Sequence, residues 1–301
     1  EGGKLDWLGF DDGKRGLPAG MPTRSVFNSL NQTQKIVYGK QFTNIWSATK
    51  NSSNVLPVTN KSFQLSGGFN TKLGANNKVG VVLALTYNQS FKRTNFDNGL
   101  YSITGGVASL NFDYHNDKYS QDVLWGALGN VTLQLGSNNK LSWKTILNIN
   151  STDYTTKRTG KDFENDPING ENIRATELAL KANTFFNTQV TGEHNLPNLK
   201  LKLHWYGSFN ILDQYVPDQR RIQYNQNVIV PNSPYTLLVS ASKTSQRSGS
   251  RYFGFLNDYV YTGGGDVAKN FAVNGLTQTV KAGYMLQVKD RLFNSRPFSI
   301  Y

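Results

Sequence analysis

Cysteine is absent from this 301-residue chain. The chain therefore has no disulfide framework, no thiol nucleophile and no thiolate ligand for a metal. Only three histidines occur, His115, His194 and His204, and none has a second ligand at a spacing typical of zinc sites. No run of about eighteen apolar residues exists, which argues against a transmembrane helix. Crossing a membrane by strands stays open, because barrel strands alternate apolar and polar residues.

Acidic residues are outnumbered by basic ones, 20 to 32, which gives a formal net charge of +12. The basic residues are spread along the chain and form no single run, so the charge does not indicate a nucleic-acid partner. We expect the basic residues to lie mainly in solvated loops. A membrane surface with lipopolysaccharide phosphates is the anionic partner that they would suit.

Alternation of apolar and polar residues is the strongest pattern present. It is clearest in 79–91 and 199–211, where one side is apolar and the other is mainly small or polar. Successive side chains of a strand point to opposite faces, so the pattern predicts long two-faced strands. The sequence therefore predicts an all-β fold, an antiparallel meander of long amphipathic strands that is part of a transmembrane β-barrel. The residues expected to face lipid are Val81, Leu83, Leu85, Leu201 and Leu203. An interfacial aromatic girdle is expected at Tyr87, Phe91, Trp143, Trp205 and Phe209.

Turn-forming residues divide the chain into hairpins. Strands are expected at 35–47, 61–73, 79–92, 101–114, 120–136, 140–154, 173–192, 199–214, 251–261 and 274–292, with a short helix at 26–38 as a minor alternative. Short turns are expected at 74–78, 137–140 and 195–198, and longer polar connections at 92–119, 155–172 and 215–250. In outer-membrane barrels short turns lie in the periplasm and long loops outside the cell. We divide the chain into 1–60, an irregular start of the barrel region, and 61–301, barrel hairpins with long outer loops.

Sites of chemistry are few. An acidic cluster of Asp162, Glu164, Asp166 and Glu171 is interpreted as a solvated loop, with calcium binding as an alternative. The tract Gly263–Asp266 lacks the sequence context of a phosphate-binding loop and is expected to be a flexible turn. We expect no catalytic residue, no bound metal, no cofactor and no enzymatic activity.

The stretch 5–18, LDWLGFDDGKRGLP, resembles a segment near the start of the barrel in TonB-dependent outer-membrane receptors of Bacteroidetes. Its matching residues are Asp11, Asp12, Gly13, Arg15 and Pro18. Weaker similarity lies in 141–160, which ends in Lys157-Arg158-Thr159-Gly160, and in 176–182. The remaining matches are Pro217, Asp218, Arg220 and Arg221.

Membership of that family would imply a 22-stranded barrel, a plug domain inside it, and nutrient uptake driven by TonB. A surface lipoprotein is a further partner that the resemblance suggests. About ten strands and no plug are recognisable, so we expect a partial barrel, with TonB engaged through a part that precedes residue 1. Two other interpretations stay open. One is a soluble extracellular β-sandwich or β-propeller that binds or cleaves glycans, and the other is a small porin-like channel.

Overall fold

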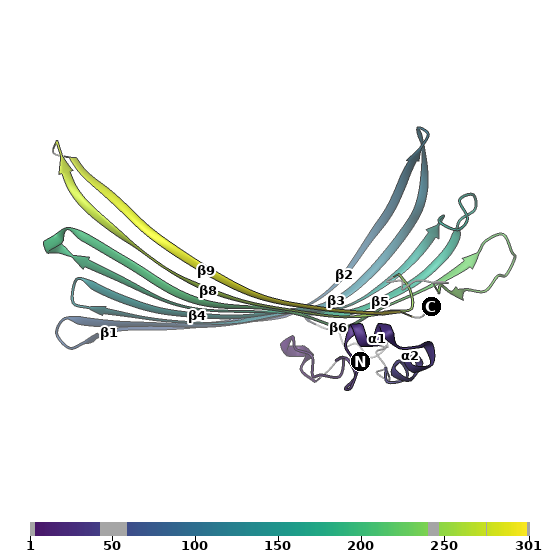
Figure 1. Ribbon diagram of the computed structural model, residues 1–301, viewed down its shortest axis with the longest axis horizontal. Coiled ribbons are helices and arrows are strands. Elements are labelled where there is room, and N and C mark those ends of the chain that lie inside the picture. Colours follow the sequence, from purple (N-terminus) through teal and green to yellow (C-terminus); the bar gives the residue numbers. More distant parts are fainter. Residues whose placement is uncertain (1–3, 43–58, 240–246, 275, 300–301) are drawn as a thin grey trace.

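One large sheet accounts for most of the fold (Figure 1). The computed structural model describes residues 4–42, 59–239, 247–274 and 276–299. The helices are η1 (Asp6–Leu8), α1 (Arg24–Ser29), α2 (Gln32–Gly39) and η3 (Pro197–Leu199). The strands are β1 (Lys61–Leu73), β2 (Asn77–Thr104), β3 (Val107–Leu135), β4 (Asn139–Asp162), β5 (Glu171–Leu196), β6 (Leu201–Asn227), β7 (Thr236–Leu237), β8 (Ser250–Val273) and β9 (Leu276–Ser299).

The strands form an antiparallel meander in the order β1-β2-β3-β4-β5-β6-β8-β9, with the short β7 paired to β6. The predicted all-β antiparallel meander is confirmed. The longest strand, β3, has 29 residues, and β8 and β9 have 24 each, whereas an ordinary globular strand has about 5–6. The sheet is a single curved layer, and the part of the chain that the structure describes contains no second sheet (Figure 1).

Connections at the two ends of the sheet differ in length. At one end, strands are joined through 74–76, 136–138, 197–200 and 274–275. At the other end the connections are 105–106, 163–170 and 228–249. The three predicted short turns are confirmed to within two residues. The predicted connection at 92–119 is wrong, because β2 and β3 continue to a two-residue turn at Gly105-Gly106. The strand predicted at 101–114 contains that turn.

The N-terminal part differs from the prediction. The predicted strand at 35–47 is wrong in its described part, where α2 runs to Gly39; residues 43–47 lie outside the described residues. The minor helical alternative at 26–38 falls on α1 and α2. A capping box starts α2: the Gln34 amide donates to Asn31 Oδ1 at 2.9 Å, and the Asn31 amide donates to Gln34 Oε1 at 3.1 Å. These reciprocal bonds satisfy amides that have no partner within the helix.

Further expectations about the β8–β9 hairpin are wrong. The tract Gly263–Gly265 is not a turn but lies inside β8, paired with Tyr206 and its neighbours in β6. A Cβ atom on Gly264 would lie 2.8 Å from the Tyr206 hydroxyl, so glycine here makes room for an aromatic side chain. The predicted strand at 251–261 is too short, and the one at 274–292 begins with the β8–β9 turn.

Each face of the sheet has its own character, since directly paired residues lie on one face. The row Leu85, Ala127, Leu147, Phe186 and Ile211 defines the apolar face. The row Gln134, Lys140, Glu193, His204 and Asp266 defines the polar face. Residues 4–42, the N-terminal segment, lie against the middle of the apolar face (Figure 1). No helix in the described ranges is long and apolar enough to span a membrane.

Candidate functional site

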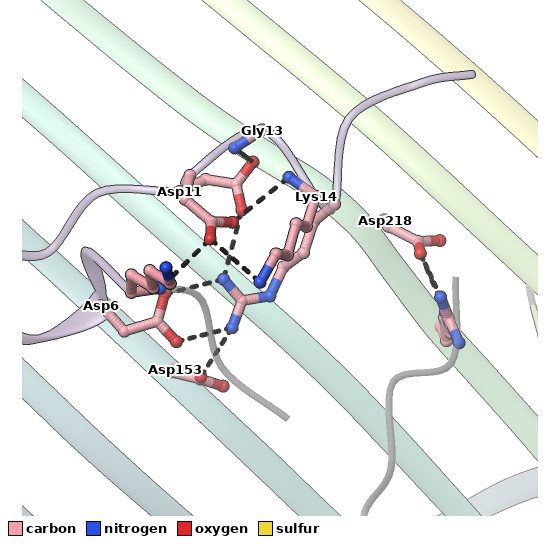
Figure 2. A network of polar contacts seen from close by, with 10 residues as sticks. Asp6, Asp11, Gly13, Lys14, Asp153 and Asp218 are labelled. Carbon is pink, nitrogen blue, oxygen red and sulfur yellow. Dashed lines mark hydrogen bonds and ion pairs between the residues drawn. The ribbon is translucent and has the colours of Figure 1, made fainter. Parts of the chain in front are cut away.

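Arg15 is the centre of a charged cluster that joins the N-terminal segment to β4. Its guanidinium donates to both carboxylate oxygens of Asp6, at 2.8 and 2.9 Å, and to Asp11 and Asp153 at 3.3 Å each. Figure 2 shows the Asp6, Asp11 and Asp153 carboxylates gathered around this one guanidinium. The planar fork of arginine suits such bidentate contacts with carboxylates. Since Asp153 lies in β4, the cluster fixes the segment to the sheet.

Burial and charge compete in this cluster. Arg15 is only 5% exposed. Burial lowers the pKa of Arg15, but hydrogen bonds and charge from Asp6 outweigh it, so the pKa is raised overall. Burial raises the pKa of Asp11 against the opposing effects of Arg15 and of the Gly13 amide. Three carboxylates contact the Arg15 guanidinium, so its removal would leave their like charges close together.

Aromatic side chains of the apolar face hold the same segment. The Tyr87 hydroxyl donates to the Trp7 carbonyl, and Trp125 Nε1 donates to the Leu8 carbonyl, both at 2.8 Å. Gly9 follows in a left-handed conformation, φ 79°, and a Cβ there would lie 2.6 Å from Ser151 Oγ. Glycine therefore permits the close approach of this turn to β4. The motif residue Asp12 does not contact the Arg15 guanidinium; its carboxylate accepts the backbone amides of Lys4 and Lys14. The hydrogen bond from the Lys4 amide is the largest of the effects that lower the pKa of Asp12.

A second cluster surrounds Asp218. Register between β6 and its neighbours shifts around Pro217 and Asp218, which form a β-bulge. Asp218 has φ 47° and is fully buried, and its carboxylate accepts from Arg220 Nε at 2.9 Å and Arg251 Nε at 2.6 Å. Arg251 also covers the Phe42 ring, with its guanidinium carbon 4.5 Å from the ring centre. This predicted motif therefore anchors the N-terminal segment at a second point.

A third cluster lies on the polar face near the longer connections. Arg158 Nε donates to Asn116 Oδ1 at 2.8 Å, and its guanidinium lies over the Tyr114 ring at 4.8 Å. Gly160 pairs with Tyr114 and has φ 142°. A Cβ on Gly160 would lie 2.1 Å from the Asp113 carbonyl oxygen, so only glycine allows this approach of β3 and β4.

Gly160→Ala is expected to destabilise this cluster strongly. The backbone conformation alone costs about 1–3 kcal/mol for a non-glycine residue, and the clash with the Asp113 carbonyl adds to it. The unfolding midpoint of the protein measures the effect. Gly207→Ala is the matched control, because a Cβ there meets nothing within 4 Å. Equal midpoints for the two variants would contradict the role of Gly160.

The structure distributes the predicted motif residues over these three places. Arg15 and Asp11 form the first cluster, Pro217, Asp218 and Arg220 the second, and Arg158 and Gly160 the third. Arg221 pairs with Glu177 at 3.2 Å on the polar face. Pro18 begins the turn 18–21, where its carbonyl accepts the Met21 amide at 3.2 Å. Partners that the sequence did not reveal are Asp6, Asp153, Arg251, Tyr114 and Asn116.

The residues predicted to face lipid all lie on the apolar face, nearer the short turns than the N-terminal segment. Leu83 is 60% exposed. Leu85 is 39% exposed and borders a hollow of about 590 Å³ that Trp7 and Leu8 also line. The face that is expected to meet lipid is thus the face that the N-terminal segment partly covers.

The acidic residues of 162–171 form ion pairs and hydrogen bonds with other groups of the protein. Asp162 accepts the Tyr114 hydroxyl at 2.6 Å, and both Asp162 and Glu164 pair with Arg247. Asp166 accepts the amides of Ile168 and Asn169, and these bonds, that of Asn169 first, lower its pKa. No group of acidic residues and histidines within the described ranges is arranged to hold a metal ion.

Histidines lie beside polar partners. His204 contacts Asp266 at 3.1 Å and His115 contacts Asp97 at 2.7 Å, while His194 contacts Asn139 at 2.7 Å. Each contact joins two directly paired residues of neighbouring strands, so the histidines take part in cross-strand polar pairs.

Comparison of the chain with protein-family models, curated proteins and solved structures finds no match in any of the three.

Proposed function

We propose that this chain is a section of the β-barrel of a TonB-dependent outer-membrane receptor, which takes up a nutrient through a plugged barrel. The observation that carries the proposal is a single-layer sheet of strands up to 29 residues long with an uncovered apolar band. In lipid every backbone group needs a partner, so such strands occur in closed barrels. The resemblance of 5–18 to that receptor family supports the more specific assignment.

The uncovered apolar band has the height of a membrane core. On β6 it runs from Leu201 to Ile211 and ends before Asp213. Ten residue steps span about 33 Å along a strand, and a tilt of about 40° reduces this to about 25 Å, the usual height of the apolar band. Beyond this band the N-terminal segment covers the same face.

Aromatic side chains lie within the band and at its outer end. Trp143 and Tyr284 lie within it, on the rows of Gly207 and Trp205 of β6, and are 55% and 75% exposed. Tyr87 and Trp125 lie toward the longer connections, where they contact the N-terminal segment. Such amphipathic rings suit the level of the lipid headgroups.

The two other interpretations account less well for the sheet. A soluble sandwich would bury its apolar face under a second sheet, which the described part of the chain lacks. A small channel would close on itself, yet β1 and β9 end the strand order without pairing to each other. Open edges support a section of a larger barrel, whose neighbouring strands would complete the pairing.

Single cysteines test the proposed faces, since the chain has no cysteine of its own. In the full-length protein in intact outer membranes, Leu83→Cys and Leu201→Cys are expected to resist a water-soluble maleimide. Thr86→Cys and Lys202→Cys, on the opposite face, are expected to react. Labelling after denaturation should reach all four and controls for expression. Ready reaction at 83 and 201 with none at 86 and 202 would reverse the assignment, and protein recovered in the soluble fraction would remove it.

A further inference from the structure

A small cavity lies on the polar face beside the longer connections. Its volume is about 280 Å³, just below the roughly 300–1,000 Å³ of typical ligand pockets. Its lining includes Thr156, Arg158, Glu177, Arg221, Gln223 and Arg247. In the proposed receptor the polar face lines the lumen, so this cavity would lie on the outer part of the ligand path. The inference below therefore rests on the proposed function.

Two of the three arginines in the cavity already have acidic partners. Arg221 pairs with Glu177 at 3.2 Å, and Arg247 pairs with both Asp162 and Glu164. Glu177 also accepts the Tyr154 hydroxyl at 3.1 Å. Three carboxylates thus pair with these two arginines, and none of the three contacts Arg158, the third arginine of the cavity.

Arg158 instead contacts an amide and an aromatic ring. Its Nε donates to Asn116 Oδ1 at 2.8 Å, and its guanidinium lies over the Tyr114 ring. Within the described part of the chain no carboxylate pairs with it, and its two terminal nitrogens donate no hydrogen bond. A guanidinium in this state presents the forked edge that binds carboxylates in a bidentate manner.

The groups that orient Arg158 are themselves fixed. Asn116 is fully buried and donates to Asn98 Oδ1 at 2.8 Å and to the Phe96 carbonyl at 3.2 Å. Tyr114 is 5% exposed, and its hydroxyl donates to Asp162 at 2.6 Å. The guanidinium is therefore held in place before any ligand arrives, which reduces the entropy lost on binding.

We infer that Arg158 is a binding site for the carboxylate group of a ligand in this cavity. A carboxylate suits a guanidinium that no carboxylate of the described residues contacts, because its two oxygens match the forked edge. A phosphate dianion would bring a second negative charge close to Asp162, Glu164 and Glu177, which already pair with the two other arginines. The residue thus selects acidic over neutral ligands of similar size.

Titration calorimetry on the full-length protein in detergent tests this site, with glucuronate as the carboxylate probe and glucose as its neutral analogue. Wild type is expected to bind glucuronate and not glucose at the same concentration. Arg158→Gln should weaken binding by roughly tenfold or more, the effect of losing hydrogen bonds to a charged group. Arg158→Lys keeps the charge but not the fork, and should bind with intermediate affinity. Inorganic phosphate should compete only weakly.

Lys157→Gln is the matched control, because Lys157 is exposed on the neighbouring position of β4 and points to the other face. It removes the same charge and should bind glucuronate as wild type does. Equal binding by Arg158→Gln and wild type would overturn the inference, as would equal binding of glucose and glucuronate. Phosphate binding more tightly than glucuronate would replace the carboxylate with a phosphate. The measurement needs no transport, so its failure is separate from failure of the labelling experiment.

Discussion

Replacing Arg15 with methionine is expected to release the N-terminal segment from the sheet. The substitution removes the guanidinium that Asp6, Asp11 and Asp153 share and places the three carboxylates around an apolar side chain. Removal of one partner from a buried ion pair costs about 3–5 kcal/mol. Amide hydrogen exchange of α1 and α2 measures the release, because both helices depend on docking rather than on their own short length.

Lys14→Met is the control for that experiment. Lys14 is adjacent in sequence, but its side chain is 68% exposed and contacts Asp12 on the surface. Exposed pairs of this kind contribute about 0–1 kcal/mol, so the exchange rates of α1 and α2 should stay near those of wild type. Unchanged protection of both helices in Arg15→Met would show that the aromatic contacts alone hold the segment.

An arginine at Leu83 is expected to prevent stable insertion of the barrel. If Leu83 faces lipid near the middle of the bilayer, the charge costs about 2–4 kcal/mol. Val82→Arg places the same charge one residue away on the polar face, where Val82 is 46% exposed, and should be tolerated. The yield of heat-modifiable protein in outer membranes compares the two. Equal yields would count against lipid contact at Leu83.

The sequence predicted the strands best where only one face is polar. β1 was predicted at both ends because it alternates over its whole length, Lys61–Leu73. The outer half of β2 was missed: 92–98 reads KRTNFDN, which is polar on both sides and gives no alternation. Backbone pairing with β3 continues there. The side chains of Lys92 and Asp122 also form an ion pair across the two strands at 2.8 Å. A strand with polar residues on both faces has the same kind of sequence as a loop.

Helix α2 shows a different kind of error. Ile36, Val37 and Tyr38 favour strands, and they lie in the predicted strand at 35–47. The stronger signal was the spacing of Asn31 and Gln34, which matches a capping box. Local capping outweighs a run of three strand-forming residues here.

The candidate sites were predicted only in part. The motif identified Arg15 and Asp218, but Arg15 meets Asp153 across 138 residues of sequence, and Asp218 meets Arg251 across 33. These contacts depend on strand register and on a bulge, neither of which the motif encodes. The motif also identified Arg158, but not its cavity, because the cavity needs Arg247 from the end of the 228–249 connection.

The pairing order of the sheet also has a consequence for how the protein assembles. Every long strand pairs with the long strands next to it in the chain, so the sheet can grow one hairpin at a time without waiting for a distant partner. At each stage the newest strand presents an unpaired backbone edge, which is the state most open to pairing with another molecule. Of the described strands β9 is the last such edge, so pairing with another molecule is expected along β9 rather than along the inner strands.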